Sequence, residues 1–351
     1  MRTAILTYSK AYNYGAVLQA YALQKVIQRM GHDCKLIDYH CPGVDGQYSY
    51  RFPKSFLDIK INAGLFLSRE KRKEIDKFRR KMDFTDPYSR ENIAEAVPLF
   101  DRFIVGSDQV WNGICTNDDP SFFLDFITET CKKNSYAASF GKTDLSEDKK
   151  NTYSKYLSDF YRISLREESG STLVKALTGR DAPVMLDPVF LLPQKEWESF
   201  TAKNDGGYVY VFQYVSNEKT IALAKEIADR RGRKLLISSS CLKSRHYGQP
   251  VKPKGIEGFL SDIRNAGLII TDSFHCAAFS IIFQRPFFAV LRENDPSNTR
   301  LENLLSSFEI LNRIYSAENA ERDEPIDYKK IGLLLEKRKT DSMNFLESVF
   351  K

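Results

Sequence analysis

The stretch that decides the fold is residues 3–39, TAILTYSKAYNYGAVLQAYALQKVIQRMGHDCKLIDY. Its apolar run at 3–8 predicts a strand, and the spacing of apolar residues over 16–30 predicts a helix with one apolar face. After Gly31 and His32, which end the helix, residues 34–39 predict a second strand. Strand, helix and strand in succession form a βαβ unit, so the sheet starts parallel and the fold is of the α/β class.

The same alternation continues outward from this unit. Further strands are predicted at 103–105, 134–140, 163–165 and 183–186, with helices at about 147–160 and 169–177. After a polar linker at 203–207, a second α/β half has predicted strands at 208–214, 234–239, 268–271 and 286–291. We therefore expect a Rossmann-like domain at 1–200, a second at 206–327 and a helical tail at 328–351. Two such halves imply a cleft, with ligands beyond the carboxyl ends of the strands.

Residues 44–98 interrupt this rhythm. They begin with Tyr48 and Tyr50 and continue into a basic run between Arg69 and Lys81. We interpret them as an insertion or a mobile flap, partly helical, that helps hold a substrate or meets a membrane surface. The alternative is a solvated insertion whose basic run is an exposed helix face.

The composition indicates a cytoplasmic globular protein. There are 52 Lys and Arg against 46 Asp and Glu, and the net charge of +6 suits an anionic substrate or membrane surface. No compact basic motif indicates a nucleic acid partner. The six Cys lack zinc spacing, so we expect no metal site, and scattered thiols fit a reducing compartment. The first residues predict a strand, with no signal peptide, and no apolar run approaches the ~20 residues that span a bilayer.

Two polar clusters follow predicted strands in the first half. The first is Tyr12-Asn13-Tyr14-Gly15, where a helix start offers free N–H groups to an anion; the alternative is an ordinary turn. The second is residues 106–112, GSDQVWN, in which a carboxylate and two amides could bond sugar hydroxyls while Trp111 packs on the ring. The alternative is that Ser107 or Asp108 caps a helix and Trp111 lies in the core.

Two more clusters carry cationic or titratable side chains. Arg166 ends a predicted strand and has the fork geometry that fits a carboxylate or phosphate; the alternative is a surface ion pair with Glu167 or Glu168. Residues 271–276, TDSFHC, place Ser273 and His275 at the end of an apolar strand, where His275 can bind an anion or move a proton. A GxSxG elbow and the phosphate loops GxxxxGK[ST] and GxGxxG are absent, which disfavours a serine hydrolase, nucleotide kinases and dehydrogenases.

In this order the clusters resemble the polysaccharide pyruvyl transferase family. The segments that carry the resemblance are YNYGAVLQAYALQ (12–24), FIVGSDQVWN (103–112), YAASFG (136–141), ISLREESGSTLVKAL (163–177), VMLDPVFLL (184–192), IRNAGLIITDSFHCAAFSIIF (263–283) and SNTRLENLLSSFEILNR (297–313). The chain departs from the family at Cys276, where many relatives carry Gly.

The resemblance implies two Rossmann-like domains facing a cleft, as in GT-B glycosyltransferases. It implies a ketal pyruvyl transferase with phosphoenolpyruvate as co-substrate, no other cofactor, and a nucleotide-linked or lipid-linked sugar diol as acceptor, in the synthesis of a capsule or exopolysaccharide. Arg166 and His275 match the family's donor-binding Arg and His, and we place Ser273 with them. Asp108 lies in the block whose Asp is near the reacting groups, and we count it with Arg166 and His275 as catalytic.

We assign the acceptor to polar and aromatic residues of the first two clusters. These residues are Asn13, Tyr14, Gln109, Trp111 and Asn112. We also expect peripheral contact with the inner face of the membrane, where a lipid-linked acceptor would lie. The alternatives are a GT-B-like glycosyltransferase that uses a nucleotide sugar and a non-catalytic glycan-binding relative.

Overall fold

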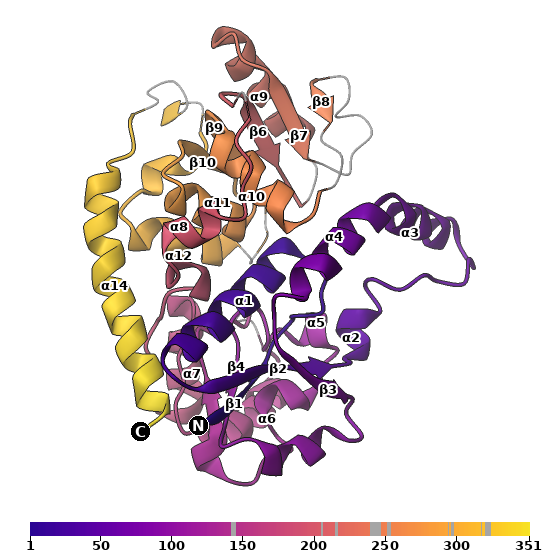
Figure 1. Ribbon diagram of the computed structural model, residues 1–351, viewed down its shortest axis with the longest axis vertical. Coiled ribbons are helices and arrows are strands. Elements are labelled where there is room, and N and C mark those ends of the chain that lie inside the picture. Colours follow the sequence, from indigo (N-terminus) through magenta and orange to yellow (C-terminus); the bar gives the residue numbers. More distant parts are fainter. Residues whose placement is uncertain are drawn as a thin grey trace. The chain divides into compact units, whose positions relative to one another are not determined.

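The chain forms two compact units, each with its own parallel sheet (Figure 1). The computed structural model describes residues 1–141, 145–204, 206–214, 217–238, 247–250, 254–293, 295, 298–316, 318–319 and 324–351. Unit 1 contains Met1–Ser49, Arg79–Leu192 and Glu336–Lys351, and unit 2 contains Tyr50–Phe78 and Pro193–Leu335. The segment 44–98 is thereby divided: residues 50–78 belong to unit 2, and the residues on either side of them belong to unit 1. The last helix ends in unit 1.

The sheet of unit 1 has the strand order β3-β2-β1-β4-β5, and every pairing is parallel. Its strands are β1 (Arg2–Leu6), β2 (Asp33–Tyr39), β3 (Phe84–Tyr88), β4 (Arg102–Val105) and β5 (Lys133–Ser135). Thr3 pairs with Cys34 on one side and with Arg102 on the other, so β1 is the central strand. A central parallel strand is covered on both faces, which explains why β1 is apolar almost throughout.

Helices surround this sheet. They are α1 (Tyr14–Arg29), α2 (Pro42–Asp45), α5 (Gly113–Thr116), α6 (Glu147–Ser158) and α7 (Glu168–Thr178), with 3-10 turns η1 (Ile93–Leu99), η2 (Pro120–Phe123), η3 (Thr130–Lys132) and η4 (Pro188–Phe190). The predicted βαβ unit is therefore confirmed as β1, α1 and β2. Asn13 is the N-cap of α1, and its side chain accepts hydrogen bonds from the backbone N–H groups of Gly15 and Ala16.

The strands predicted at 163–165 and 183–186 are wrong as regular strands. Only isolated bridges join Leu165 to Ala138 and to Val184. Serine hydroxyls are interleaved here with backbone hydrogen bonds such as that from the N–H of Ala138 to the carbonyl of Ser164. Ser135 Oγ donates to the carbonyl of Ser164 at 3.2 Å, and Ser164 Oγ accepts from the N–H of Ala137 at 3.1 Å. Side chains that bond the neighbouring backbone compete with regular sheet pairing.

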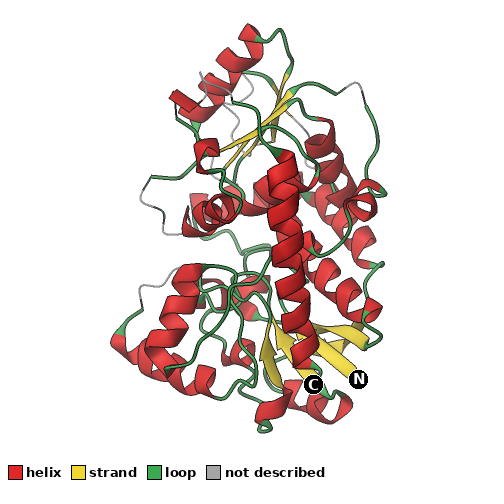
Figure 2. Ribbon diagram, turned by 90° about the vertical axis from the view of Figure 1, so that its left-hand side faces the viewer, coloured by secondary structure: helices red, strands yellow, loops and turns green. Residues whose placement is uncertain are grey.

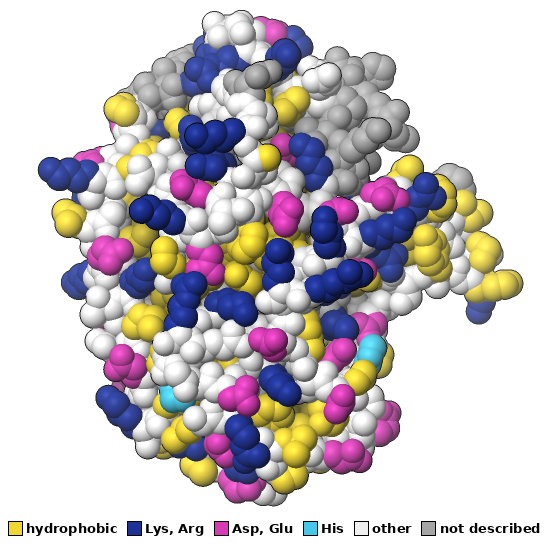
Figure 3. All heavy atoms as spheres, in the orientation of Figure 1, with side chains coloured by type: hydrophobic (Ala, Val, Ile, Leu, Met, Phe, Trp, Pro, Cys, Tyr) yellow, Lys and Arg dark blue, Asp and Glu magenta, His cyan; other side chains and the backbone are white. Residues whose placement is uncertain are grey.

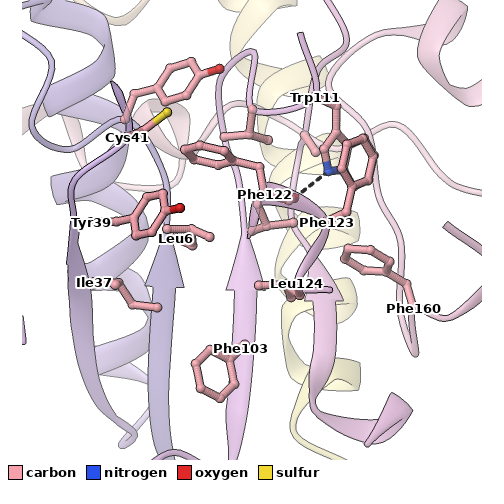
Figure 4. Close-up of a cluster of buried hydrophobic side chains, with 14 of the residues drawn as sticks. Leu6, Ile37, Tyr39, Cys41, Phe103, Trp111, Phe122, Phe123, Leu124 and Phe160 are labelled. Atoms are coloured by element: carbon pink, nitrogen blue, oxygen red, sulfur yellow. Dashed lines mark hydrogen bonds between the residues drawn. The ribbon is translucent and has the colours of Figure 1, made fainter. Parts of the chain in front are cut away.

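The core of unit 1 lies beside the sheet and joins the strands to the loops that follow them (Figure 4). Leu6, Ile37 and Phe103 come from three neighbouring strands and are fully buried. Residues 122–124 and Trp111 close the cluster, and Trp111 Nε1 donates to the carbonyl of Phe122 at 2.9 Å. The loop that carries the GSDQVWN segment is therefore fixed by core packing.

The sheet of unit 2 repeats the parallel pattern with the order β10-β9-β6-β7-β8. Its strands are β6 (Val209–Phe212), β7 (Leu235–Ser238), β8 (Gln249–Pro250), β9 (Leu268–Thr271) and β10 (Phe287–Ala289). Its helices are α3 (Phe56–Leu67), α4 (Arg69–Arg79, whose last residue belongs to unit 1), α8 (Gln194–Glu198), α9 (Glu218–Arg230), α10 (Ile256–Asn265), α11 (Phe274–Ile282) and α12 (Asn298–Ser307), with the turn η6 (Leu311–Arg313). The predicted second α/β half is confirmed. Residue 239 of the predicted strand 234–239 lies outside the described residues.

The long final helix α14 (Tyr328–Val349) begins in unit 2 and ends on unit 1 (Figure 2). Its last turns are held by Ser342 Oγ, which accepts from the N–H of Leu186 at 3.0 Å, and by the carbonyl of Val349, which accepts from Arg102 Nε at 3.0 Å. The ring of Phe350 stacks on His32 at 3.8 Å between centroids. No helix among the described residues is long and apolar enough to span a bilayer.

Gly106, directly after β4, tests how tightly this loop is packed. Its φ is +110°, and an added Cβ would lie 2.4 Å from the carbonyl oxygen of Tyr136. Gly179 also has a positive φ, +72°, but nothing lies within 4 Å of its Cβ position. We expect Gly179→Ala to cost about 1 kcal/mol of unfolding free energy and Gly106→Ala roughly two to three times as much. Denaturant unfolding of both variants measures this, and equal losses would contradict the packing argument.

Candidate active site

Asp108 lies just beyond the carboxyl end of β4 in an unusual backbone conformation. Its φ is +75°, a left-handed value that Asp tolerates better than most residues. Its carboxylate accepts a hydrogen bond from the N–H of Gln109 at 2.9 Å, and its side chain keeps 12% of its surface exposed. The cap of the next helix, α5, is Asn112. The alternative in which Ser107 or Asp108 caps that helix is therefore wrong.

Arg166 lies between two carboxylates in the interior of unit 1. Its guanidinium is 2.9 Å from Asp187 Oδ2 and 3.4 Å from Asp108 Oδ1, and its side chain is 2% exposed. Burial by itself would lower the pKa of Arg166, but Asp108, Asp187 and Glu167 together raise it. The alternative of a surface ion pair with Glu167 or Glu168 is therefore wrong, because the ion pairs are buried and reach Asp108 and Asp187.

Asp187 connects three segments, and the sequence reasoning did not select it. Its Oδ2 accepts from Arg166 and from Ser107 Oγ at 3.2 Å, while its Oδ1 accepts from the N–H of Val189 at 3.2 Å. Asp187 is thus the N-cap of η4 and the partner of the loop after β4. The dipeptide Asp187-Pro188 was a usable signal, because Pro at the first helical position commonly follows an Asp cap.

The five residues assigned to the acceptor separate into two groups. Asn13, Gln109 and Asn112 are partly exposed polar side chains, and Gln109 Oε1 accepts from Asn112 Nδ2 at 2.9 Å. Tyr14 is buried in the first turn of α1. Trp111 is 1% exposed and stacks on Phe123 with centroids 5.6 Å apart. The prediction that a sugar ring packs on Trp111 is wrong, because core side chains cover this residue.

In unit 2, the predicted donor residues follow β9 at the start of α11. Ser273 is the N-cap of this helix, and its Oγ accepts from the N–H of Cys276 at 3.3 Å. His275 is 5% exposed and packs against the ring of Phe274. Cys276 is fully buried, and burial raises the pKa of its thiol far above the ordinary value. The residue by which the chain departs from many relatives is therefore an inert part of the core.

A second arginine, which the sequence reasoning passed over, lies at this edge of unit 2. Arg292 follows β10, donates from Nε to Asp272 Oδ2 at 3.0 Å and from Nη1 to Asp295 Oδ2 at 3.1 Å, and is 25% exposed. Asp272 also accepts from the N–H of Tyr214 at 2.8 Å, so it ties the ends of β6, β9 and β10 together. Burial would lower the pKa of Arg292, but Asp272 and Asp295 raise it. The available signal was a basic residue directly after the predicted strand 286–291.

Each unit therefore presents buried or half-buried charged side chains at the carboxyl edge of a parallel sheet. This is where ligands bind in open α/β sheets. Over the described part of the chain, no three His, Cys, Asp or Glu side chains are grouped as metal ligands. The fold and these two edges define a two-unit Rossmann-like protein of the GT-B-like class, as expected from the sequence.

The family follows from a comparison with family models. The model described as polysaccharide pyruvyl transferase matches residues 13–294, and the chain belongs to that family. The matched range includes Asp108, Arg166, Asp187, His275 and Arg292. A search of curated proteins found no match.

The chain is also similar to solved structures, and the first of those that follow bears on its fold alone. A putative UDP-N-acetylglucosamine 2-epimerase from Listeria monocytogenes aligns with a TM-score of 0.51 and 10% identity over 95% of this chain and 94% of that one. UDP-GlcNAc 2-epimerase from Neisseria meningitidis, bound to UDP-GlcNAc, gives 0.47 and 12% over 98% and 99%. Os79 from O. sativa, in complex with UDP, gives 0.48 and 11% over 99% of each chain.

Removing the carboxylate of Asp187 is expected to destabilise the protein by about 3–5 kcal/mol, because Arg166 would stay buried with a partner missing. Asp187→Ala is compared with Asp125→Ala, which removes the carboxylate of the more exposed Arg90–Asp125 pair, 2.6 Å long. The second change should cost at most about 1 kcal/mol. Denaturant unfolding measures both values, and a loss at Asp187 no larger than that at Asp125 would contradict the structural role.

Proposed function

We propose that the protein transfers the pyruvyl group of phosphoenolpyruvate to two hydroxyls of one sugar, as a cyclic ketal, with release of phosphate. The family match over residues 13–294 is the observation that carries this proposal. The charged groups at the carboxyl edges of both sheets support it, because phosphoenolpyruvate has a carboxylate and a phosphate to bind. The product would be a pyruvylated surface polysaccharide, such as a capsule or exopolysaccharide.

The reaction needs two proton transfers as well as anion binding. One sugar hydroxyl adds to C2 of phosphoenolpyruvate, and its proton balances the proton that C3 receives as the methylene becomes a methyl group. The bond from C2 to the phosphate oxygen then breaks. The second hydroxyl bonds to C2, and its proton balances the one taken up by the departing phosphate. A base near the hydroxyls and an acid near C3 are therefore sufficient, with cations for the leaving group.

In this proposal Asp108 is the base. Its carboxylate is partly exposed, and the guanidinium of Arg166 lies 3.4 Å from it on the buried side. The guanidinium donates from Nη2 to Asp108 Oδ1, and this contact fixes the orientation of the carboxylate. The family resemblance gives Arg166 a part in donor binding as well. A donor anion there would share Arg166 with Asp108 and Asp187, so we assign Arg166 the positioning of Asp108 in addition to contact with the donor.

His275 and Arg292 would hold the donor in unit 2. His275 is the proposed phosphate ligand or the acid for C3, and Ser273 lies two residues before it at the helix start. Arg292 adds a cation whose orientation is set by Asp272 and Asp295, while Nη2 makes no hydrogen bond to the described residues. An Arg held in this way can offer its remaining N–H groups to a phosphate or carboxylate without losing its position.

The sugar would bind over Asn13, Gln109 and Asn112, which are partly exposed amides at the carboxyl edge of unit 1. No cofactor other than phosphoenolpyruvate belongs to the proposal. Because phosphoenolpyruvate is a cytoplasmic metabolite, we place the reaction in the cytoplasm. The acceptor is a nucleotide-linked or lipid-linked sugar, and a lipid-linked one would bring the protein to the inner membrane surface.

Incubation with phosphoenolpyruvate and a panel of nucleotide-linked and lipid-linked sugars tests the proposal. We expect a ketal product by mass and an equal amount of phosphate, with Asp108→Asn reducing turnover by ~100-fold or more, because Asn cannot take a proton. Asn also tolerates a positive φ, so the variant should fold. Thermal unfolding serves as the control. Sugar transfer with nucleotide release would favour the glycosyltransferase alternative, and near-normal turnover of Asp108→Asn would remove Asp108 from the mechanism.

Replacing Arg292 by Lys should raise the apparent KM for phosphoenolpyruvate by ~10-fold or more while affecting the acceptor KM little, because a fork of donors becomes a point charge. Arg264→Lys is the matched control. Arg264 is 20% exposed in the same unit, donates to Thr201 at 2.7 Å and pairs with Glu198. An unchanged KM for phosphoenolpyruvate in Arg292→Lys, or an equal change in Arg264→Lys, would contradict the donor-binding role.

A further inference from the structure

An apolar face is exposed on the part of unit 2 formed by residues 50–78, which we name the α3–α4 arm. Its large exposed apolar residues are Tyr50, Phe52, Leu57, Ile59, Phe66 and Leu67. Ile59, Ala63, Phe66 and Leu67 are spaced as i, i+4, i+7 and i+8, so they share one face of α3. Phe66 is 54% and Leu67 71% exposed, which is costly in water unless something covers them.

The helix that carries this face, α3, is capped at its start. Ser55 and Asp58 form a capping box at its start, in which each side chain bonds the backbone N–H of the other. Asn62 Oδ1 accepts from the N–H of Arg51, and Asn62 Nδ2 donates to the carbonyl of Arg51 at 2.8 Å. The segment before the helix is thereby held against α3. The apolar side chains are thus presented on a capped helix.

Basic side chains accompany the apolar face. The arm contains eight Lys and Arg against four Asp and Glu, so it supplies an excess of four to a chain whose net charge is +6. The guanidinium of Arg69 lies over the ring of Phe66 at 4.5 Å, and Lys60 is an exposed residue of α3. Figure 3 shows dark-blue and yellow side chains together over α3 and α4, at the right of the view. The arm therefore combines apolar and cationic contacts on one surface.

The base of the arm is buried, in contrast to α3. Ile75 and Phe78 of α4 are 0% and 2% exposed, and the ring of Phe78 packs against Phe200 at 5.2 Å. Gly255, which caps α10, lies so close to α4 that an added Cβ would be 2.3 Å from the Cβ of Glu74. The end of α4 is therefore fixed to unit 2 by packing.

We propose that the α3–α4 arm binds the surface of an anionic lipid bilayer. The apolar face of α3 would lie at the boundary between headgroups and acyl chains, and the Lys and Arg side chains of the arm would contact the headgroups. Exposed apolar side chains beside basic ones are the combination that interfacial helices use. Charge complementarity favours an anionic surface over a second copy of this chain, whose identical arm would bring a like-charged surface to the contact. The binding itself needs no catalytic turnover. Its role in the cell rests on the proposed function, because membrane binding would place the enzyme where a lipid-linked acceptor lies.

Sedimentation of the full chain with vesicles tests the proposal without any substrate. We expect binding to vesicles of phosphatidylcholine mixed with phosphatidylglycerol and much weaker binding to phosphatidylcholine alone. The triple variant Ile59→Ser, Phe66→Ser, Leu67→Ser should lower the partition coefficient by ~10-fold or more. The control triple variant Ile114→Ser, Leu311→Ser, Leu333→Ser changes side chains that are 71%, 49% and 71% exposed outside the arm, and it should bind as the parent does.

A second variant separates charge from apolar contact. Lys60→Gln, Lys73→Gln, Lys77→Gln should remove most of the preference for anionic vesicles and the sensitivity to salt. Thermal unfolding checks folding, and light scattering checks the oligomeric state. Equal vesicle binding by the two triple serine variants would overturn the proposal. It would also be overturned if the parent did not bind vesicles and the serine variant of the arm alone changed its oligomeric state. Pyruvyl transfer to a soluble acceptor should be unchanged in the arm variants, so failure of the lipid proposal and failure of the proposed reaction give different results.

Discussion

The buried ion pairs of Arg166 are the constraint on which the candidate site of unit 1 depends. A guanidinium that is 2% exposed must be paired, and Asp187 and Asp108 supply the pairing from two other segments. Asp187 also bonds Ser107 and caps η4, so the ion pair, the loop after β4 and the turn at 188–190 are held as one network. Asp108 can therefore keep a left-handed backbone and a partly exposed carboxylate at the sheet edge, because its neighbours are fixed.

Unit 2 uses a related arrangement at its own sheet edge. The side chain of Asp272 is buried, accepts from a backbone N–H after β6 and holds Arg292 after β10. In both units a carboxylate beyond the end of a strand pairs with an arginine from another segment: Asp108 after β4 with Arg166, and Asp272 after β9 with Arg292. The difference lies in exposure: Arg166 is enclosed, whereas a quarter of the Arg292 side chain remains accessible. Arg292 is accordingly the better placed of the two to meet a solvated anion, and Arg166 the better placed to control a neighbouring carboxylate.

The arm shows how a segment inserted in sequence can belong to a different unit from its neighbours. Residues 50–78 separate β2 from β3, two paired strands of unit 1, yet they pack with unit 2. The packing of Phe78 on Phe200 and the close approach of Glu74 to Gly255 provide the contacts. Neither contact has a local sequence signal, because both join residues more than a hundred positions apart. The basic and aromatic composition of the segment, by contrast, is plain in the sequence.

The sequence by itself determined the fold class, the βαβ start, the second α/β half and the placement of Asp108 and His275 beyond the carboxyl ends of β4 and β9. Periodicity and strand-end polarity are local properties, and residues 3–39 carry them in full. Tertiary structure alone decided that Trp111 is core, that Arg166 is paired with Asp187, and that Arg292 joins the edge that carries His275. It also decided that the segments at 163–165 and 183–186 form bridges rather than strands. These outcomes depend on which distant groups compete for the same space and the same hydrogen bonds, and no local pattern encodes that competition.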